Sequence, residues 1–422
     1  MSEKETTFKT GSSIVVEACQ ICGHSELEPI LFLGYMPPVN AFHPIGQKPH
    51  EQPSYPAQVL NCPACNLVQL GSVVDSAVLF PAEYPYTSST TKVLRDNFAQ
   101  LYEECSEILN LQPEDLIVDV GSNDGNLLSN FQGNHKVLGI TPEDIGKLAI
   151  EKGIPTILDY FTPEVVQKAI ADHGKAKVVT ATNVFAHIEK PNEVTKLVAE
   201  ILTEDGVFIS ESHYFPRLVE TLQYDTVYHE HLRYYSLHSL AALLSRHGLE
   251  VFHAREIPPH GGSIRVYAAR KGTRQVRDSV EKIKQYERDT VLKPGSLKDF
   301  AQRVVLSKLA LHSLISGIKK EGGRIYGIGA PSRASTLINY AGLDERMVDS
   351  IMEVSGSHKI GKYIPGTLIP VEAEAKLYDD QPEYALLFSW HIADELAPKL
   401  REKGYNGKFI VPLPEPRILE SA

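Results

Sequence analysis

The sequence has no long hydrophobic run. A helix needs about eighteen consecutive apolar residues to cross a membrane, and no stretch of the 422 residues reaches that length. The first five residues, Met1–Glu5, are polar or charged apart from the initial methionine, unlike the basic and apolar start of a secretory signal peptide. We therefore expect neither a membrane span nor a signal peptide, and we expect a cytoplasmic location.

The chain also lacks an excess of positive charge. Its formal net charge at pH 7 is −11, which repels the phosphate backbones of DNA and RNA unless basic residues cluster strongly. We therefore expect no nucleic-acid partner. Small anions can still bind, because helix N-termini and a few arginines attract them locally.

Cysteine is scarce, with five residues in the whole chain, and a cytoplasmic protein keeps its cysteines as thiols. Four of them nevertheless form two Cys-x-x-Cys pairs: Cys19 with Cys22, and Cys62 with Cys65. Four thiolates in this doubled spacing favour one structural Zn²⁺ ion. Ligation by His24 or His43, or four unrelated buried cysteines, are the alternatives.

The length suggests more than one domain, and a hydrophobic content of 42% is sufficient for a sizeable core. We predict three units: a zinc-binding domain at residues 14–75, an α/β domain at 76–272 and a second α/β domain at 273–422. The first unit is rich in Pro, Gly and Cys and has only short strand-like runs. A metal would supply the cross-link that so small a core lacks.

In the central unit, β-rich runs alternate with amphipathic stretches, which indicates a parallel sheet covered by helices on both faces. A helix is expected at residues 90–109, ahead of the sheet. The expected strands are 116–120, 136–140, 177–181, 207–211, 249–255 and 263–269. The last two are joined by a segment too short for a crossover helix, so we expect an antiparallel pair at the sheet edge.

Residues 274–320 are charged and helical with one apolar stripe, and they lead into the third unit. Strands are expected there at 324–328, 385–389 and 409–411, and a helix at 332–340. The glycine turn Gly327-Ile328-Gly329 lies before that helix, whose N-terminus could receive a phosphate. A purely structural turn is the alternative.

Another glycine turn, Gly121–Gly125, directly follows the strand that ends Asp119-Val120. Glycine lets the backbone turn sharply and approach a ligand closely. The run lacks the Gly-x-Gly-x-x-Gly of dinucleotide binders, and it resembles the first motif of Rossmann-like S-adenosylmethionine methyltransferases. That resemblance implies cofactor contacts from Asp119, Gly121, Ser122, Asn123, Gly125, Thr141 and Asn183. Thr141 stands where the resembled fold usually has an acid for the ribose, and Glu143 is the nearest carboxylate.

Titratable side chains are concentrated after two later strands of the same sheet. Asn183 and His187 follow the strand 177–181, and the stretch 224–235 follows the strand 207–211. In an open parallel sheet both segments lie beyond the carboxyl ends of the strands, beside the cofactor.

With these motifs together, the chain resembles the C-methyltransferases of deoxysugar biosynthesis, which methylate C3 of thymidine-diphosphate 4-keto-6-deoxyhexoses. The resemblance extends from Val15 to Pro416. It is carried by both cysteine pairs, 84–89, 121–125, Asn183 with His187, 228–231, 260–265 and 327–331. It implies an α/β protein with a small N-terminal zinc-binding domain, a central Rossmann-like class I methyltransferase domain and a C-terminal Rossmann-like α/β domain.

The resemblance also implies a chemistry. A hydrogen on carbon beside a ketone is weakly acidic, so the site needs a base and donors aimed at the enolate oxygen. His231 is then the expected base, with Glu230 as its partner or as a ligand of sugar hydroxyls. Tyr228 and His187 would face the keto oxygen and the sugar ring, and Tyr86 would close the pocket.

Substrate contacts are expected from His260, Arg265, Ser332, Arg333 and Trp390. Two other hypotheses stay open at this point. One is a NAD(P)-dependent nucleotide-sugar oxidoreductase that uses the turn at 327–331, although this turn lacks a third glycine in register. The other is a non-catalytic zinc protein that binds RNA, for example, which the negative charge disfavours. The sequence does not determine the oligomeric state.

Overall fold

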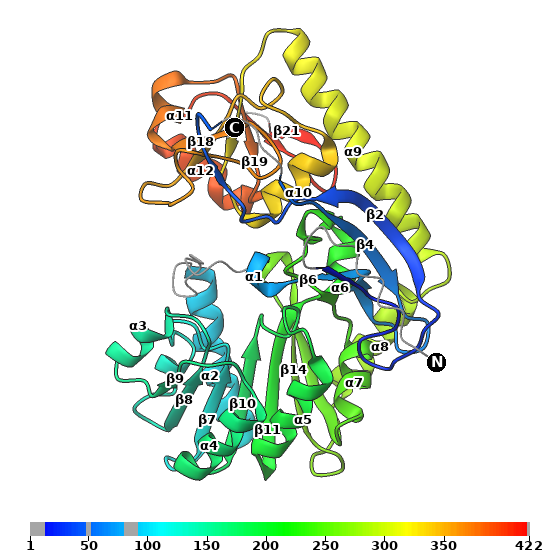
Figure 1. Cartoon of the computed structure of the whole chain (residues 1–422), viewed down its shortest axis with the longest axis vertical. Helices are drawn as coiled ribbons and strands as arrows, with labels where there is room; N and C mark the ends of the chain where they lie inside the picture. Colours follow the sequence, from blue (N-terminus) through cyan, green and yellow to red (C-terminus); the bar gives the residue numbers. More distant parts are fainter. Residues whose placement is uncertain (1–12, 48–51, 80–91, 420–422) are drawn as a thin grey trace.

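The computed structural model describes residues 13–47, 52–79 and 92–419. The chain forms two lobes (Figure 1), one around a seven-stranded sheet and the other around an eight-stranded sheet. A four-stranded sheet that contains β2 and β4 extends along one side between the lobes, next to the long helix α9.

The central sheet has the strand order β13-β14-β11-β10-β7-β8-β9. Its strands are β7 (Leu116–Val120), β8 (Lys136–Ile140), β9 (Thr156–Ile157), β10 (Ala176–Thr182), β11 (Leu202–His213), β13 (Leu249–Ile257) and β14 (Ser263–Arg270). β14 is antiparallel to both of its neighbours, and the other pairings are parallel. The expected parallel sheet with an antiparallel β13–β14 pair at one edge is therefore confirmed.

Helices cover both faces of this sheet (Figure 1). They include α2 (Lys92–Leu109), α3 (Gly146–Glu151), α4 (Pro163–His173), α5 (Pro191–Ile201) and α7 (Leu237–Ser245), with the 3₁₀ turn η2 (Leu128–Asn130). After β11 come α6 (Phe215–Glu220) and the 3₁₀ turn η3 (Tyr224–Thr226), whose buried residues pack with the C-terminal lobe, and the 3₁₀ turn η4 (Pro259–Gly261) lies between β13 and β14. Local sequence sets their starts. Thr162 accepts a hydrogen bond from the amide of Val165, and Ser236 forms a reciprocal cap with Ser239.

The N-terminal unit shares sheets with both lobes. Its elements are β1 (Ser13–Val15), β2 (Glu28–Met36), β3 (His43–Pro44), β4 (Tyr55–Asn61), β5 (Val68–Leu70), β6 (Ser72–Val74) and α1 (Ser76–Leu79). β5 pairs with β12 (Arg233–Tyr234), which belongs to the central unit. β3 pairs with β17 of the C-terminal sheet. The three predicted units thus interleave, and their exact bounds stay a prediction.

The C-terminal sheet has the order β21-β20-β19-β15-β16-β18-β17-β3. The elements are α8 (Asp278–Asp289), α9 (Ser296–Lys320), β15 (Ile325–Ile328), α10 (Ser332–Ala341), β16 (Ser350–Glu353), β17 (Lys362–Tyr363), β18 (Pro370–Ala373), α11 (Ala375–Asp380), β19 (Tyr384–Leu387), η5 (Trp390–Ile392), α12 (Ala393–Glu402), β20 (Lys408–Val411) and β21 (Arg417–Leu419). The five strands from β20 to β18 are parallel. This is the second α/β unit that the sequence predicts.

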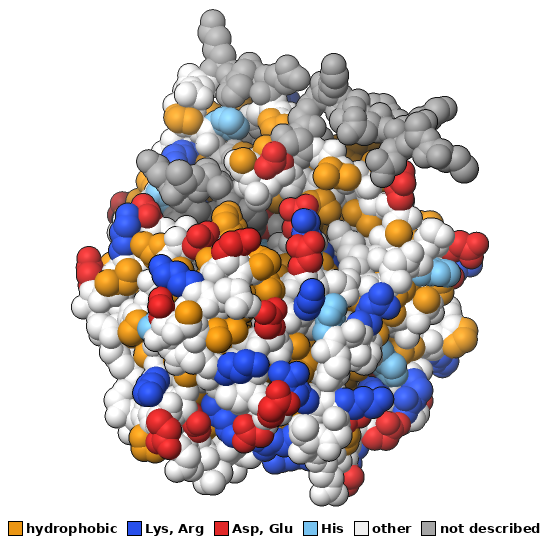
Figure 2. Space-filling view, turned by 60° about the horizontal axis from the view of Figure 1, so that its bottom comes forward, with side chains coloured by type: hydrophobic (Ala, Val, Ile, Leu, Met, Phe, Trp, Pro, Cys, Tyr) orange, Lys and Arg blue, Asp and Glu red, His pale blue; other side chains and the backbone are white. Residues whose placement is uncertain are grey.

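The surface of the molecule carries charges of both signs. On the face in Figure 2, basic and acidic side chains are intermixed rather than gathered into one field. Among the described residues, none of the helices combines the length and the apolar character needed to cross a bilayer.

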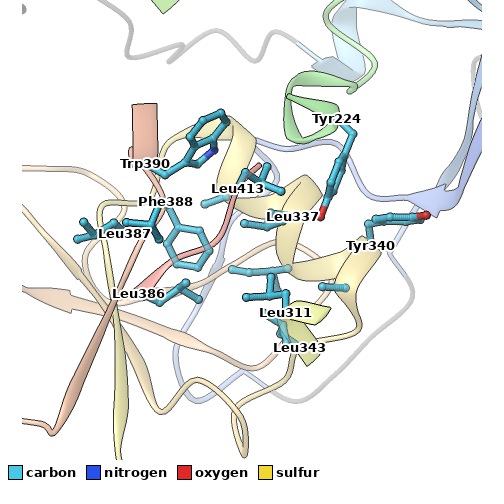
Figure 3. Packing of buried hydrophobic residues seen from close by; sticks show 14 of the residues in the cluster. Tyr224, Leu311, Leu337, Tyr340, Leu343, Leu386, Leu387, Phe388, Trp390 and Leu413 are labelled. Carbon is cyan, nitrogen blue, oxygen red and sulfur yellow. The ribbon is translucent and has the colours of Figure 1, made fainter. Parts of the chain in front are cut away.

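Apolar packing joins the lobes. One buried cluster includes residues of β2, of the segment 215–234 and of the C-terminal sheet and helices. Figure 3 shows Tyr224 of η3 facing Leu337 and Tyr340 of α10, and the rings of Tyr224 and Tyr340 have centroids 5.3 Å apart. The segment that follows β11 is therefore anchored in the core of the C-terminal lobe.

Candidate active site

The two cysteine pairs meet in space. The first pair lies in the turn after β1 and the second in the β4–β5 turn, and the four sulfur atoms lie within 4.8 Å of one another. The Sγ atoms of Cys19 and Cys65 are 3.4 Å apart, and those of Cys22 and Cys62 are 3.6 Å apart. Four thiolates at about 2.3 Å around a tetrahedral zinc ion would be roughly 3.8 Å apart. The donor set therefore fits Zn²⁺, and within the described residues neither His24 nor His43 belongs to it.

The turn after β7 has the backbone that the glycines permit. Gly121 and Gly125 have φ angles of 75° and 76°, and Asn123 between them has a φ of 49°. A side chain at Gly121 would meet Val184, because an added Cβ would lie 2.5 Å from a Val184 methyl group. Left-handed backbone of this kind costs free energy and is concentrated at functional sites.

A carboxylate joins the turn from the end of β8. The polar side chains of Asn123 and Thr141 lie near the Glu143 carboxyl group and partly offset the rise in its pKa that burial causes. Glu143 is half-buried. Thr141 stands where an acid is expected, and Glu143 is the nearby carboxylate that could accept hydrogen bonds from ribose hydroxyls. The donor set fits the ribose of S-adenosylmethionine.

Asp119 and Ser122 connect the turn to the neighbouring strands of the sheet. Asp119 is buried in the sheet and accepts a hydrogen bond of 2.6 Å from the Thr180 hydroxyl. Burial raises its pKa to about 7. Ser122 lies against β8, because a Cβ at Gly139 would lie 2.5 Å from its Oγ. Both residues lie at the turn, as predicted, but their side chains are buried against the neighbouring strands.

The segment after β10 connects the cofactor turn to the titratable cluster. Asn183 has a φ of 58°, and its amide donates to the Glu211 carbonyl oxygen at 2.8 Å. Val184 packs on Gly121 at one side of the segment. At the other side the His187 ring lies against His231, with centroids 5.0 Å apart.

His231 has a defined tautomer. Its Nδ1 lies 3.0 Å from the carbonyl oxygen of Thr226, and its Nε2 lies 3.0 Å from the Tyr228 hydroxyl. A carbonyl oxygen only accepts, so Nδ1 must carry the hydrogen. Nε2 is then an acceptor, and the Tyr228 hydroxyl donates to it. The imidazole is oriented for accepting a proton at Nε2.

Glu230 is held by the N-terminal unit. Asn40 donates from Nδ2 to Glu230 Oε1 at 2.7 Å, and only 3% of the Glu230 surface is exposed. His187 forms a hydrogen bond with the Glu230 backbone. The structure thus brings together four of the five predicted catalytic residues. The fifth, Tyr86, lies outside the described residues.

The histidines around this cluster are held neutral. Burial, and then the charges of His187 and His213, lower the pKa of His231 well below its usual value. Burial and the charge of Arg333 lower the pKa of His213 to about 3 and that of His260 to about 4. The rings are therefore neutral at physiological pH, which is the protonation state in which an imidazole can accept a proton.

Arg265 lies elsewhere. It is fully buried on β14 and forms ion pairs with Glu211 (2.6 Å) and Glu104 (2.6 Å), and it donates to Asn97 at 2.9 Å. These partners on β11 and α2 occupy most of its donors. These contacts favour a structural role for Arg265, and the expected substrate contact stays a prediction.

Arg333 and Trp390 also have protein partners. Arg333 binds both carboxylate oxygens of Asp225, at 2.8 and 2.9 Å, and the indole of Trp390 donates to the same carboxylate at 2.8 Å. Ser332 opens α10 and is half-buried. The substrate contacts expected from Ser332, Arg333, Trp390 and His260 stay predictions, and the donors of Arg333 and Trp390 that bind Asp225 are occupied within the protein.

Sequence reasoning missed Asp225 and Asn40. Asp225 lies inside the dense stretch 224–235, but no spacing distinguishes it from its neighbours. Asn40 lies in a proline-containing loop without any motif. The partners of both residues lie far away in the sequence, so no local pattern indicates the contacts.

Comparison with protein families agrees with this arrangement. Three family models match the chain: a zinc binding domain at residues 19–80, a methyltransferase domain at 92–254 and a C-methyltransferase C-terminal domain at 258–414. The sheet, the turn after β7 and the thiol cluster thus define a zinc-containing, S-adenosylmethionine-dependent methyltransferase of class I fold.

Individual proteins are similar as well. The C-methyltransferase NovU of Streptomyces niveus is 32% identical over 411 residues, which cover 96% of this chain and 97% of that protein. The chain belongs to the C-methyltransferase family. Among solved structures, an S-adenosylmethionine-dependent methyltransferase from Clostridium acetobutylicum matches at 15% identity, over 44% of this chain and 94% of its own, with a TM-score of 0.34. Magnesium protoporphyrin IX methyltransferase from Synechocystis, with bound S-adenosylhomocysteine, matches at 15% identity over 42% and 83%, with a TM-score of 0.33.

Proposed function

We propose that this C-methyltransferase methylates C3 of a nucleotide-linked 4-keto-6-deoxy sugar, and that His231 removes the C3 proton. The observation that carries the proposal is the tautomer of His231, whose Nδ1 is fixed on the Thr226 carbonyl oxygen while Nε2 accepts. The family assignment sets aside the oxidoreductase and the non-catalytic binding protein. The resemblance of the motifs to deoxysugar enzymes supports the substrate class.

The substrate follows from the chemistry of forming a bond at carbon. Carbon becomes nucleophilic when a neighbouring carbonyl group stabilises the anion, so a ketone at C4 activates the hydrogen at C3. Tyr228 and His187 surround the proposed base and can direct polar groups at the keto oxygen. The nucleotide would extend toward Ser332 and His260.

The steps assign a role to each side chain. The substrate carbon displaces the Tyr228 hydroxyl from Nε2, and His231 takes the C3 proton. The released hydroxyl donates to the oxygen at C4, which becomes the enolate oxygen. S-adenosylmethionine, when bound, would supply an electrophilic methyl group: the enolate carbon would bond to that methyl as the methyl–sulfur bond breaks, S-adenosylhomocysteine would leave, and the C4 carbonyl would re-form. Close approach of the two carbons accounts for much of the acceleration.

Replacing the proposed base tests this function. His231→Ala should lower methyl transfer by at least about 100-fold, the scale of general-base catalysis, while the Kd for S-adenosylmethionine stays unchanged. Turnover is measured by mass spectrometry and cofactor binding by calorimetry. His229→Gln is the matched control, because this buried ring lies against Tyr55 instead. Wild-type turnover in His231→Ala would refute the base assignment.

A further inference from the structure

Asp225 connects the C-terminal lobe to the catalytic segment. Its side chain is fully buried and receives Arg333 Nε at 2.8 Å, Arg333 Nη2 at 2.9 Å and the Trp390 indole at 2.8 Å. All three donors come from α10 and η5 of the C-terminal lobe. Arg333 is held in turn by His391 Nδ1 at 2.9 Å and stacks over Trp390 at 5.1 Å.

The backbone next to Asp225 determines the state of the proposed base. Thr226 follows Asp225 in η3, and its carbonyl oxygen accepts the hydrogen of His231 Nδ1 at 3.0 Å. The same 3₁₀ turn places Tyr224 against Tyr340 of α10. Two consecutive side chains of η3 are therefore anchored in the C-terminal lobe, and the third residue supplies the carbonyl oxygen.

We propose that Asp225 is a positioning residue through which Arg333 and Trp390 of the C-terminal lobe fix the tautomer of His231. The proposal rests on the function proposed for His231. Three donors on one buried carboxylate make η3 rigid, since breaking such a pair leaves a buried charge uncompensated. Without the clamp the Thr226 carbonyl oxygen moves, Nδ1 loses its acceptor, and the hydrogen can transfer to Nε2. An imidazole protonated at Nε2 cannot take the substrate proton there.

This inference changes the role expected for the C-terminal lobe. Arg333 and Trp390 are expected from the sequence as substrate contacts. Both instead point their donors at a carboxylate of the methyltransferase lobe. A loss of either should therefore lower kcat more than it raises KM, which is the opposite of a lost ground-state contact.

The test uses the full-length enzyme with Asp225→Asn, Arg333→Gln and the double variant. Each single variant should lower kcat by about 10- to 100-fold, the cost of a misplacement near 1 Å, with the Kd for S-adenosylmethionine unchanged. The double variant should be no slower than the slower single variant, because both changes break one linkage. Arg333→Lys, which keeps the charge but not the two-point contact, should fall between wild type and Arg333→Gln.

Asp349→Asn is the matched control. Asp349 accepts hydrogen bonds from Lys319 at both carboxylate oxygens, at 3.0 and 2.9 Å, and this ion pair lies within the C-terminal lobe. This variant should lose stability without losing turnover. If Asp225→Asn does not fold, the Arg333→Lys and Arg333→Gln pair decides the question. Unchanged kcat in the Arg333 variants, or a rise in KM alone, would overturn the proposal.

A spectroscopic measurement separates this proposal from the one it rests on. In protein labelled with ¹⁵N-histidine, the His231 signals are assigned by their loss in His231→Gln. Wild type should show hydrogen on Nδ1, and Asp225→Asn should show a mixture of both tautomers. An unchanged tautomer in Asp225→Asn refutes the positioning role whatever His231 does. A shifted tautomer together with full turnover of His231→Ala refutes the base assignment alone.

Discussion

At the scale of single residues, the cofactor site depends on a carboxylate that the sequence offers only indirectly. Position 141 holds a threonine where an acid is expected, and the structure places the Glu143 carboxyl group near Asn123 and Thr141. The proposed task of this carboxylate is to accept hydrogen bonds from the ribose of S-adenosylmethionine. The glycine turn at 121–125 was predictable from the sequence. The position of the Glu143 side chain beside Asn123 was not, because it depends on how the chain turns after β8.

Glu143→Gln tests that task. The amide loses the charge and one acceptor, so the affinity for S-adenosylmethionine should fall by roughly 10-fold, which corresponds to a lost hydrogen bond to a charged group. Isothermal titration with S-adenosylmethionine gives the Kd. Asp144→Asn is the control, since Asp144 is exposed and forms an ion pair with the exposed Lys147. Equal affinity in Glu143→Gln and wild type would remove Glu143 from the site.

The neutral histidines predict a dependence on pH. The pKa of His213 is lowered to about 3 from 6.5, so protons bind this ring more readily in the unfolded chain. His213 therefore lowers the free energy of unfolding progressively as the pH falls from 6.5 to about 3. His213→Gln removes this loss.

The free energy of unfolding of His213→Gln, relative to wild type, should therefore rise by about 1–2 kcal/mol between pH 7.5 and pH 5. Comparing the variant with wild type removes the opposing contribution of Asp119, whose pKa of about 7 favours the folded state at low pH. Urea unfolding at both pH values measures the difference. His173→Gln, at an exposed position, is the control. A difference that does not change with pH would show that His213 titrates normally.

At the scale of elements, the sequence predicted strands and helices of the two α/β units well. Leu116–Val120 and Lys136–Ile140 match the expected bounds, because continuous β-branched runs are typical of strands buried on both faces. Pairing was predictable only where the connection was short, as between β13 and β14. The pairings of β5 with β12 and of β3 with β17 join segments far apart in sequence, and no local pattern encodes them.

The partners of Arg265 were also beyond prediction from local sequence. Arg265 lies in the strand expected at 263–269, whereas Glu104 and Glu211 come from α2 and β11. Arg265→Ala should lower the free energy of unfolding by about 3–5 kcal/mol, because two buried acids lose their partner. The KM for the sugar substrate should stay near the wild-type value.

Arg255→Ala is the comparison for this variant, because Arg255 is half-buried and binds the same Glu104 from a more exposed position. It should cost less than about 1 kcal/mol. Denaturant unfolding and steady-state kinetics are measured on both variants. A raised KM with unchanged stability in Arg265→Ala would restore the substrate contact expected from the sequence.

At the scale of the whole molecule, the zinc-binding unit supports the catalytic segment. The turn that holds Cys62 and Cys65 joins β4 to β5, and β5 pairs with β12, which begins two residues after His231. Asn40 of the same unit binds Glu230. A zinc ion held by four thiolates is structural and has no open position for a substrate. The strands that it would hold together help to orient residues 228–231.

Cys62→Ser tests this support. The protein should lose its zinc, and a structural zinc site can contribute about 10 kcal/mol or more of folding free energy, so β4 and β5 should no longer hold β12. Turnover should fall together with zinc content, measured by elemental analysis on the same samples. Cys105 lies in α2, outside the cluster of four thiols. Cys105→Ser keeps all four ligands and should therefore keep both zinc and activity. Full activity of zinc-free protein would show that the unit is dispensable.

The most direct test of the account is methyl transfer from labelled S-adenosylmethionine to a nucleotide-linked 4-keto-6-deoxy sugar, compared with its 4-hydroxy counterpart. The position of the label is read by nuclear magnetic resonance. The account predicts one labelled methyl group bonded to C3 of the ketone and none on the alcohol, because only the ketone acidifies that carbon. Methylation of both compounds, or a methyl group found on oxygen, would contradict it.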